Sequence, residues 1–320
     1  MGKTLEKKSR NIAIDVLRGE LALFVLLGHA VQRAFPDTFE SIYLFKIIYT
    51  FHMPFFILLS GYTSIYSKNL NLKSKVLRLI YPTYLWTLLL YWLKDLKFTG
   101  LTPSVEFPDA FKKYIKLVLI RPDYIIWFLY VVFVSAIIVW LGNKIAGKYR
   151  LIFYTAVVGI LVLFGGGIRP FGIYRIRCYL PFYILGYYIA AYKEKIEEIF
   201  KRKYIKYLLL LVPVWLYLGT MWSFDSNVII ASVLAVLGML CVYAITQLGI
   251  MKINPAVKVL KYIGKYSLEF YLLQIAFLGF CFGEGIIRIF ITFMAALICV
   301  TISLFVCRKI KFLNKILFGK

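Results

Sequence analysis

The sequence predicts an all-α, polytopic membrane protein of about ten transmembrane helices with both termini in the cytoplasm. Its 320 residues are 62% hydrophobic and 18% aromatic, whereas soluble domains average about 45–50% apolar residues. The apolar residues gather in runs long enough to cross a bilayer. Basic residues collect between alternate runs, as they do in multi-spanning proteins.

The runs define the expected spans and leave no room for a large soluble appendage. In chain order, the spans are 12–34, 44–66, 76–96, 124–142, 151–167, 178–192, 206–222, 228–248, 266–282 and 286–307. We therefore expect one transmembrane domain over residues 1–320, with a short basic N-terminus (1–11) and a short basic tail (308–320), both cytoplasmic. The multi-pass pattern indicates a cell membrane location.

Lysine and arginine are divided unevenly between the two sets of loops. With the N-terminus in the cytoplasm, most of the basic residues fall in inside segments. The outside loops hold only Lys97, Lys112, Lys113, Lys116, Arg121, Arg169, Arg175 and Arg177. This asymmetry follows the positive-inside rule. Most of the net charge of +24 therefore reflects membrane topology. The expected partners of these basic residues are the anionic headgroups of membrane lipids, and nucleic acid is not expected as a partner.

The first span carries five ionisable residues: Asp15, Arg18, Glu20, His29 and Arg33. Such groups are costly in hydrocarbon and usually face a protein interior or a wet cavity. Arg18 and His29 are eleven residues apart, so on a helix they fall about 20° apart on one face, with roughly 16 Å between them along the axis. Asp15 lies one turn below Arg18. Buried helix-packing polar groups are the alternative, but three residues in register favour a function.

The second span contains the other of the two histidines, His52, followed by Pro54. His29 lies about 25 Å from the inner edge of its span, and His52 about 12 Å from the outer edge. Both therefore fall in the outer half of a core about 30 Å thick, and antiparallel neighbours would bring the two imidazoles together. A structural histidine bonded to a carbonyl is the alternative for His52. Pro54 is expected to kink the helix or to start a new one.

Two further cations lie near the inner edge of the third span. Arg78 is about one turn inside it, and Lys75 precedes it. Together with Arg18 they predict a cationic mouth open to the cytosol and suited to phosphates, which guanidinium groups bind bidentately. Snorkelling to lipid headgroups is the alternative, above all for Lys75. The five cysteines show no metal-ligand spacing, so we expect no metal site.

Polar residues also mark the outer loops and the ninth span. A glycine-rich outside loop carries Arg169, Arg175 and Arg177 against the positive-inside trend, which suggests an acidic or pyrophosphate-bearing partner; a purely structural loop is equally consistent. The ninth span places Glu269 and Gln274 within the membrane. No nucleotide-binding loop is visible, which weakens an ATP-driven function.

Several of these motifs together resemble the acyltransferase family 3 membrane proteins. They are Arg18-x10-His29 preceded by Asp15, the segment F-H-M-P-F-F-I-L-L-S-G-Y, the element R-L-I-Y-P, the element Trp127–Phe128–Leu129, and Y-S-L-E-F-Y-L-L. Within the family, the sequence is most similar to sugar O-acetyltransferases of surface polysaccharides. The resemblance implies transfer of an acyl group, expected to be acetyl, from cytoplasmic acyl-CoA to a glycan or lipid-linked sugar hydroxyl at or near the outer face. Gln274 departs from the family, which often has histidine there.

The resemblance and the chemistry of the residues suggest roles for each. His29 would accept the hydroxyl proton as general base, and His52 or the Tyr62 hydroxyl would stabilise the oxyanion. Asp15 would hold Arg18, which would bind the CoA phosphates with Arg78 and Lys75. Substrate binding is assigned to Tyr62, Ser60, Trp127, Arg169, Arg175 and Glu269. A covalent acyl-histidine and direct transfer both remain open.

Two other classes of function use membrane helices. A transporter or flippase of a lipid-linked glycan also needs intramembrane charges, but the sequence shows no inverted repeat of the kind such proteins often contain. A structural scaffold is disfavoured by the charged first span.

The charge asymmetry leads to a prediction about topology. A reporter fused after Lys320 and one inserted near Arg202 should both report the cytoplasm, and one near Pro108 should report the outside. Reporter activity in intact cells measures this. A cytoplasmic signal from the Pro108 insertion would eliminate the ten-span topology.

Overall fold

The structure is a computed structural model. It describes residues 12–66, 71–98, 112, 115, 120–122, 126–199, 202–250, 255–278 and 283–319. The expected N-terminal segment 1–11, Pro108, the outside lysines Lys113 and Lys116, and Cys281 lie outside the described residues.

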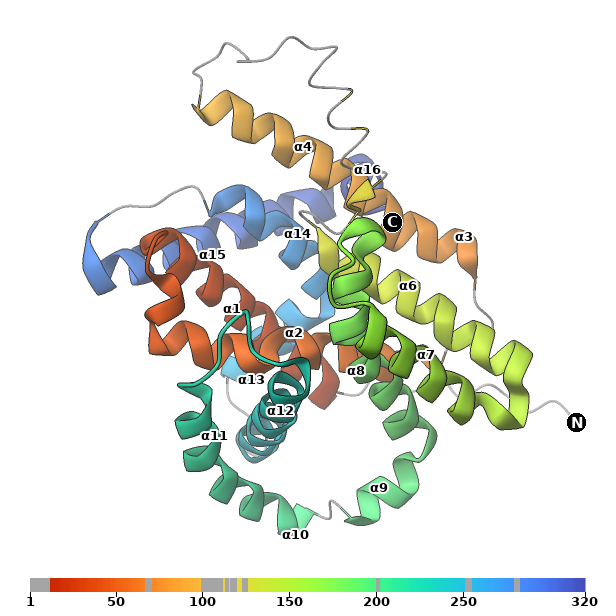
Figure 1. Cartoon of the computed structure of the whole chain (residues 1–320). Coiled ribbons are helices and arrows are strands. Elements are labelled where there is room, and N and C mark those ends of the chain that lie inside the picture. The colour runs from red at the N-terminus through yellow and green to blue at the C-terminus, as the bar shows by residue number, and fades with distance from the viewer. Residues whose placement is uncertain are drawn as a thin grey trace, which may run out of the picture.

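The described residues form helices and turns, with no strand among them (Figure 1). The elements are α1 (Ile12–Ala34), η1 (Phe39–Ser41), α2 (Tyr43–Ser64), α3 (Leu72–Lys75), η2 (Val76–Ile80), α4 (Tyr81–Phe98), α6 (Trp127–Leu141), η3 (Gly142–Ala146), η4 (Gly147–Tyr149), α7 (Arg150–Phe164), η5 (Pro170–Gly172), α8 (Ile173–Ala191), α9 (Lys193–Ile199), α10 (Arg202–Ile205), η6 (Lys206–Leu211), α11 (Val212–Gly219), α12 (Val228–Ile250), α13 (Pro255–Lys265), α14 (Ser267–Phe277), α15 (Gly285–Lys309) and α16 (Lys311–Phe318).

A helical segment lies at each of the ten predicted spans, so the all-α class is confirmed. By length and composition alone, four helical runs are long and apolar enough to cross a membrane: Tyr43–Ser64, Trp127–Phe164, Val228–Gly249 and Gly285–Lys309. The first span is not among them because it carries the charges of Asp15, Arg18 and Glu20. The number of spans and the orientation of the termini stay predictions.

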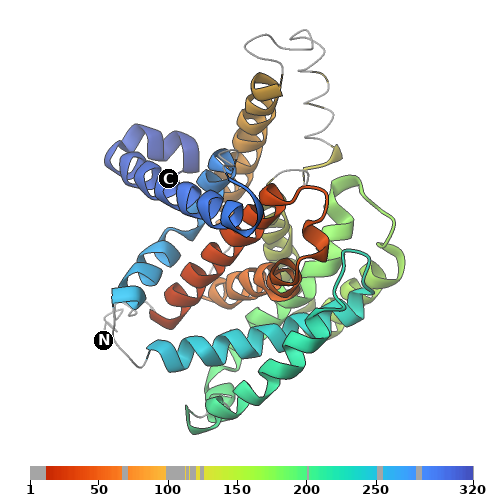
Figure 2. The same ribbon diagram turned by 90° about the vertical axis from the view of Figure 1, so that its left-hand side faces the viewer.

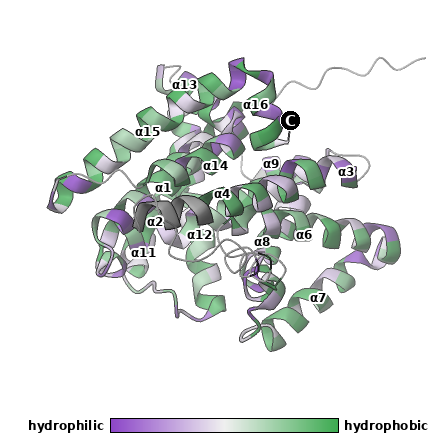
Figure 3. Cartoon of the chain, turned by 90° about the horizontal axis from the view of Figure 1, so that it is seen from above, coloured by the Kyte–Doolittle hydropathy of each residue, from purple (hydrophilic) through white to green (hydrophobic). Residues whose placement is uncertain are grey.

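The helices α1 and α2 form the centre of the protein. Figure 2 shows them in red and orange, with α8, α12, α13 and α15 around them. Their central side chains Leu21, Leu26 and Ile57 are fully buried. In contrast, large apolar residues on outer helices point outward, for example Leu163 with 76% and Ile286 with 81% of their surface exposed. Figure 3 shows that apolar residues cover much of these outer helices, as a lipid-facing surface requires.

Glycines allow two of the central helix pairs to touch through their backbones. A Cβ added to Gly264 of α13 would overlap the carbonyl oxygen of Asp15 on α1, and one on Gly19 would overlap that of Leu260. Gly61 of α2 and Gly186 of α8 face each other's helix backbone in the same way. Such close approach by small residues is typical of helix pairs packed within membranes.

The helix α2 runs without interruption through Pro54. The expectation that a new helix starts after His52 is therefore wrong. Packing on both sides holds the segment, because His52, Met53 and Phe55 are all buried, and neighbouring helices commonly compensate for proline in membrane helices.

The basic tail 308–320 contains an element that the sequence analysis did not identify. After α15 ends at Lys309, the chain forms α16 and folds back beside α4 (Figure 1). The indole nitrogen of Trp86 donates to the carbonyl oxygen of Leu317 at 2.8 Å, and the Trp86 ring stacks on Phe318 with 6.4 Å between centroids. Gly319, with φ of 64°, lies so close that a Cβ would overlap the Leu77 carbonyl oxygen.

The glycine contacts lead to a stability prediction. Gly264→Ala should lower the free energy of unfolding by about 1–3 kcal/mol, the usual cost of overpacking, because the added methyl group meets backbone that cannot rotate away. Gly159→Ala on α7 is the matched control, since nothing lies within 4 Å of its added Cβ. Thermal unfolding of both variants in detergent measures the difference, and equal midpoints would contradict the close crossing.

Candidate active site

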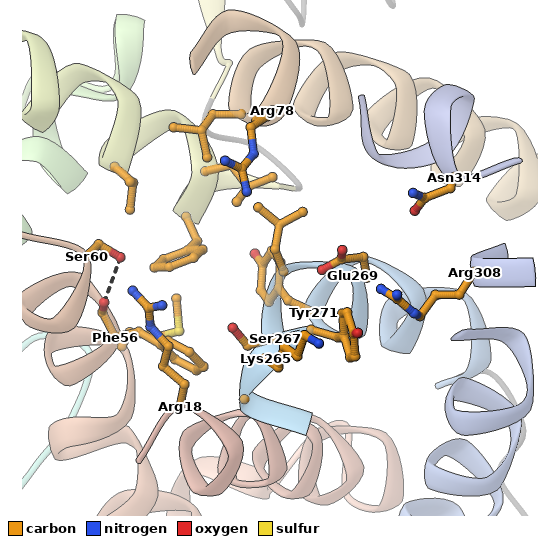
Figure 4. A pocket seen from close by; sticks show the side chains of 18 residues that line it. Arg18, Phe56, Ser60, Arg78, Lys265, Ser267, Glu269, Tyr271, Arg308 and Asn314 are labelled. Atoms are coloured by element: carbon orange, nitrogen blue, oxygen red, sulfur yellow. Dashed lines mark hydrogen bonds between the residues drawn. The ribbon is translucent and has the colours of Figure 1, made fainter. Parts of the chain in front are cut away.

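A cavity of about 410 Å³ lies where α1, α2, η2, α6, α13, α14, α15 and α16 meet. Basic side chains from four separate segments line it: Arg18, Arg78, Lys265 and Arg308. Figure 4 shows these four around one space, with Ser60, Glu269 and Tyr271. The convergence of several cations in one cavity makes it a site for a ligand with multiple negative charges.

Arg18 enters the cavity from α1 and is held by α2. Its guanidinium group donates to the Thr63 hydroxyl at 2.9 Å and to the carbonyl oxygen of Leu59 at 3.4 Å. The Thr63 hydroxyl in turn donates to that same carbonyl at 3.0 Å. These contacts fix the planar group at the cavity wall. Asp15 lies one turn below and is buried at the crossing with Gly264; the role expected for it, holding Arg18, stays a prediction.

The structure separates Lys75 from the other expected phosphate ligands. Arg78 lies on the π-helix η2 and lines the cavity with Arg18. Lys75 instead lines a second cavity of about 330 Å³, together with Arg150. Burial and then the neighbouring charge of Arg78 lower the pKa of Lys75. Although the two residues are only about one helical turn apart, their side chains therefore line different cavities.

Two of the four cations were not predicted as ligands from the sequence. Lys265 and Arg308 approach the same aromatic ring, that of Tyr266, with their charged groups 5.1 and 3.8 Å from its centroid. In the sequence each lies directly beside a predicted span, where basic residues are expected on the inner side. Glu269 lines the same cavity and is 1% exposed. The nearby motif Y-S-L-E was the one signal in the sequence that points to this wall.

Ser60 lines the cavity from α2, and its hydroxyl donates to the Phe56 carbonyl oxygen at 2.9 Å. Tyr62 lies elsewhere. It lines a separate, mostly apolar cavity of about 230 Å³. Tyr62 and His52 are ten residues apart on α2, which places them about 15 Å apart along the axis. The structure therefore does not bring Tyr62 together with His52, and the oxyanion role of either residue stays a prediction.

The two imidazoles lie at one level of the α1–α2 pair. Nδ1 of His29 bonds Oε1 of Gln32 at 2.8 Å, and Nδ1 of His52 donates to the Ile48 carbonyl oxygen at 2.7 Å. The Tyr49 ring lies against both segments, 4.6 Å from the His52 ring and in the space beside Gly28. With Nδ1 as the donor, Nε2 of each neutral ring is left to accept a proton.

A group of stacked side chains joins the beginning of α6 to α8. The Trp127 ring stacks on Tyr179 at 4.8 Å, and the Arg175 guanidinium lies 4.7 Å from the Trp127 centroid. Two of the expected substrate residues, Trp127 and Arg175, are thus brought together.

The third outer residue of the expected set is placed differently. Arg169 is exposed, and its guanidinium group lies 4.4 Å from the Tyr174 ring centroid. It lies before η5, at the entrance to α8, whereas Arg175 lies within α8. The two arginines therefore contact different aromatic rings.

No group of three or more histidine, cysteine or acidic residues with metal-binding geometry occurs among the described residues. Gln274 is fully buried on α14. Neither polar atom of its carboxamide has a hydrogen-bond partner within the described part of the chain. A buried amide without partners is costly, so this position marks a polar spot inside the helix bundle.

Comparison with known proteins gives one family. A family model described as an acyltransferase domain matches residues 11–308. Nodulation protein NolL of Mesorhizobium japonicum is 25% identical over 193 residues, which are 57% of this chain and 48% of that protein. Nodulation protein NolL of Sinorhizobium fredii is 40% identical over 57 residues, 17% of this chain and 16% of that protein. The matches span less than half of either relative. No solved structure matches the chain.

Proposed function

Because the chain belongs to the family of this acyltransferase domain, which covers residues 11–308, it is a membrane acyltransferase, and we propose a specific reaction for it. The enzyme moves an acyl group, which we take to be acetyl, from cytoplasmic acyl-CoA to a hydroxyl group of a surface glycan or lipid-linked sugar. The transfer takes place at or near the outer face of the cell membrane.

The observation that carries this proposal is that one helix holds both a cation of the main cavity and a histidine that could act as the base. Arg18 lines the cation-rich cavity, and His29 lies eleven residues further along α1, about 16 Å away along the axis. A donor with phosphates at one end and a thioester at the other fits such an arrangement. The phosphates of acyl-CoA would bind Arg18, Arg78, Lys265 and Arg308, while the acyl group extends toward His29.

The chemistry at the imidazoles is a general base reaction. Nε2 of His29 accepts the proton of the acceptor hydroxyl group, while the oxygen of that hydroxyl group attacks the carbonyl carbon of the thioester. The tetrahedral intermediate then expels the CoA thiolate, which takes the proton back from His29. His52 stabilises the oxyanion or orients its neighbour. Transfer through a covalent acyl-histidine is the alternative route.

The acceptor side uses the residues near the outer loops. Arg175 and Trp127 contact each other, and a lipid-linked sugar would bring a pyrophosphate that suits an arginine. Glu269 and Ser60 line the cavity that would hold the donor. Acyl-CoA-dependent labelling of a glycan by the purified protein tests the proposal, and a transporter or flippase would give no such labelling.

His29 provides the first prediction from this reaction. His29→Ala should lower the transfer rate by about 10²–10⁴-fold, the usual contribution of a general base, while acyl-CoA still binds because the cations remain. Transfer rate and acyl-CoA affinity are measured on the same preparation. Transfer at the wild-type rate would exclude His29 as the base, and loss of both properties would indicate a structural histidine.

Arg78 and Lys75 provide a matched pair for the donor site. Arg78→Ala should weaken acyl-CoA binding by about 1–3 kcal/mol, the range for hydrogen bonds to charged groups, because it removes a ligand from the main cavity. Lys75→Ala removes the same charge from the neighbouring cavity and should have a much smaller effect. Calorimetric titration with acyl-CoA compares them, and equal losses would show that only general electrostatic attraction is involved.

A further inference from the structure

The wall of the donor cavity includes a residue from outside the family domain. The matched domain ends at residue 308, and α16 follows it. Asn314, in the middle of α16, lines the same cavity as Arg18, Arg78 and Arg308. Figure 4 shows its carboxamide facing this space on the same side as Arg308. The chain after the domain therefore completes the cavity.

The position of α16 is fixed by specific contacts. Trp86 of α4 binds the Leu317 carbonyl oxygen, and Phe318 is completely buried against it. Gly319 lies against the backbone at Leu77, the residue before Arg78. Because the helix is anchored at its end, the Asn314 side chain is presented to the cavity in a defined place. Its backbone nitrogen is already used in the bond to the Ile310 carbonyl oxygen at 3.1 Å.

The carboxamide of Asn314 has an unused acceptor. Its Oδ1 is buried and has no hydrogen-bond partner within the described part of the chain. A buried acceptor without a donor is costly, so a ligand that fits here carries a hydrogen-bond donor, N–H or O–H. Phosphate oxygens do not meet this need, because they are acceptors and are already matched by the arginines. The residue therefore faces a different part of the donor from the cations.

The base of the nucleotide supplies the required groups. Adenine carries an exocyclic N6 amino donor beside the N7 acceptor, and a carboxamide binds this edge with two hydrogen bonds. Asn314 lines the same cavity as the cations that would hold the phosphates. This is where the nucleotide of acyl-CoA would lie if its thioester reaches the imidazole. Resting on the proposed function, we propose that α16 forms the nucleotide wall of the donor site and that Asn314 binds adenine.

The experiment compares two nucleotides that differ only at this edge. Adenosine 3′,5′-bisphosphate has the N6 amino group, and inosine 3′,5′-bisphosphate has a carbonyl oxygen in its place. Both compete with labelled CoA for the purified full-length protein. We expect the wild type to bind the adenosine compound about tenfold more tightly, within the range for one bidentate pair, and Asn314→Leu to bind both alike.

Control variants separate recognition from general effects. Lys315→Ala removes a charge from the exposed side of α16 and should keep the preference for adenosine. Trp86→Phe removes the bond to Leu317 but keeps an aromatic ring, and should reduce the preference by loosening α16. Thermal unfolding confirms that each variant is folded.

Three outcomes would overturn the inference. Equal affinity of the wild type for the two nucleotides excludes recognition of the N6 edge, even if the variants do not fold. A preference that persists in Asn314→Leu assigns the recognition to another residue. Loss of the preference in Lys315→Ala would make it an effect of charge. Failure of the wild type to bind CoA at all would instead overturn the proposed function.

Discussion

Direct contact between helix backbones determines where the functional side chains lie. The pairs α1–α13 and α2–α8 touch at glycines, and η2 touches the C-terminal glycine. Residues that line the main cavity are immediate neighbours of these contacts in the sequence: Arg18 beside Gly19, Ser60 beside Gly61, Lys265 beside Gly264, and Arg78 beside Leu77. Backbone atoms cannot change rotamer, so these contacts hold the cations more rigidly than side-chain packing would.

The clustered cations impose a cost that the protein offsets in two ways. Like charges in one cavity repel each other more strongly than in water. The Tyr266 ring lies beside both Lys265 and Arg308, and aromatic faces attract cations. The Thr63 hydroxyl and the Leu59 carbonyl accept hydrogen bonds from Arg18. An anionic ligand would remove the remaining repulsion, so binding of the donor and stability of this region are linked.

The sequence predicted what depends on a single helix or on two adjacent ones. Hydrophobic runs located the helices, and helical spacing placed Arg18 and His29 on one face. The complete set of cavity residues could not be predicted from the sequence, because Arg308 and Asn314 meet Arg18 only when segments from opposite ends of the chain pack together. Lys75 and Arg78 were grouped by their proximity in sequence, but helical rotation sends them into separate cavities. Tyr62 and Ser60 are only two residues apart in the sequence, yet they line different cavities because they lie on different sides of α2.

The two halves of the site are built from different kinds of contact. The donor half relies on backbone contacts at glycines, which few substitutions can preserve. The outer half relies on side-chain stacking between Trp127, Tyr179 and Arg175 on α6 and α8, and stacked rings accept replacement by other aromatic residues more readily. The acceptor preference can therefore change through substitutions in α6 and α8 without moving Arg18 or His29. Because α1 runs through both halves as one helix, the proposed donor would keep the same span from phosphate to thioester while the acceptor varies.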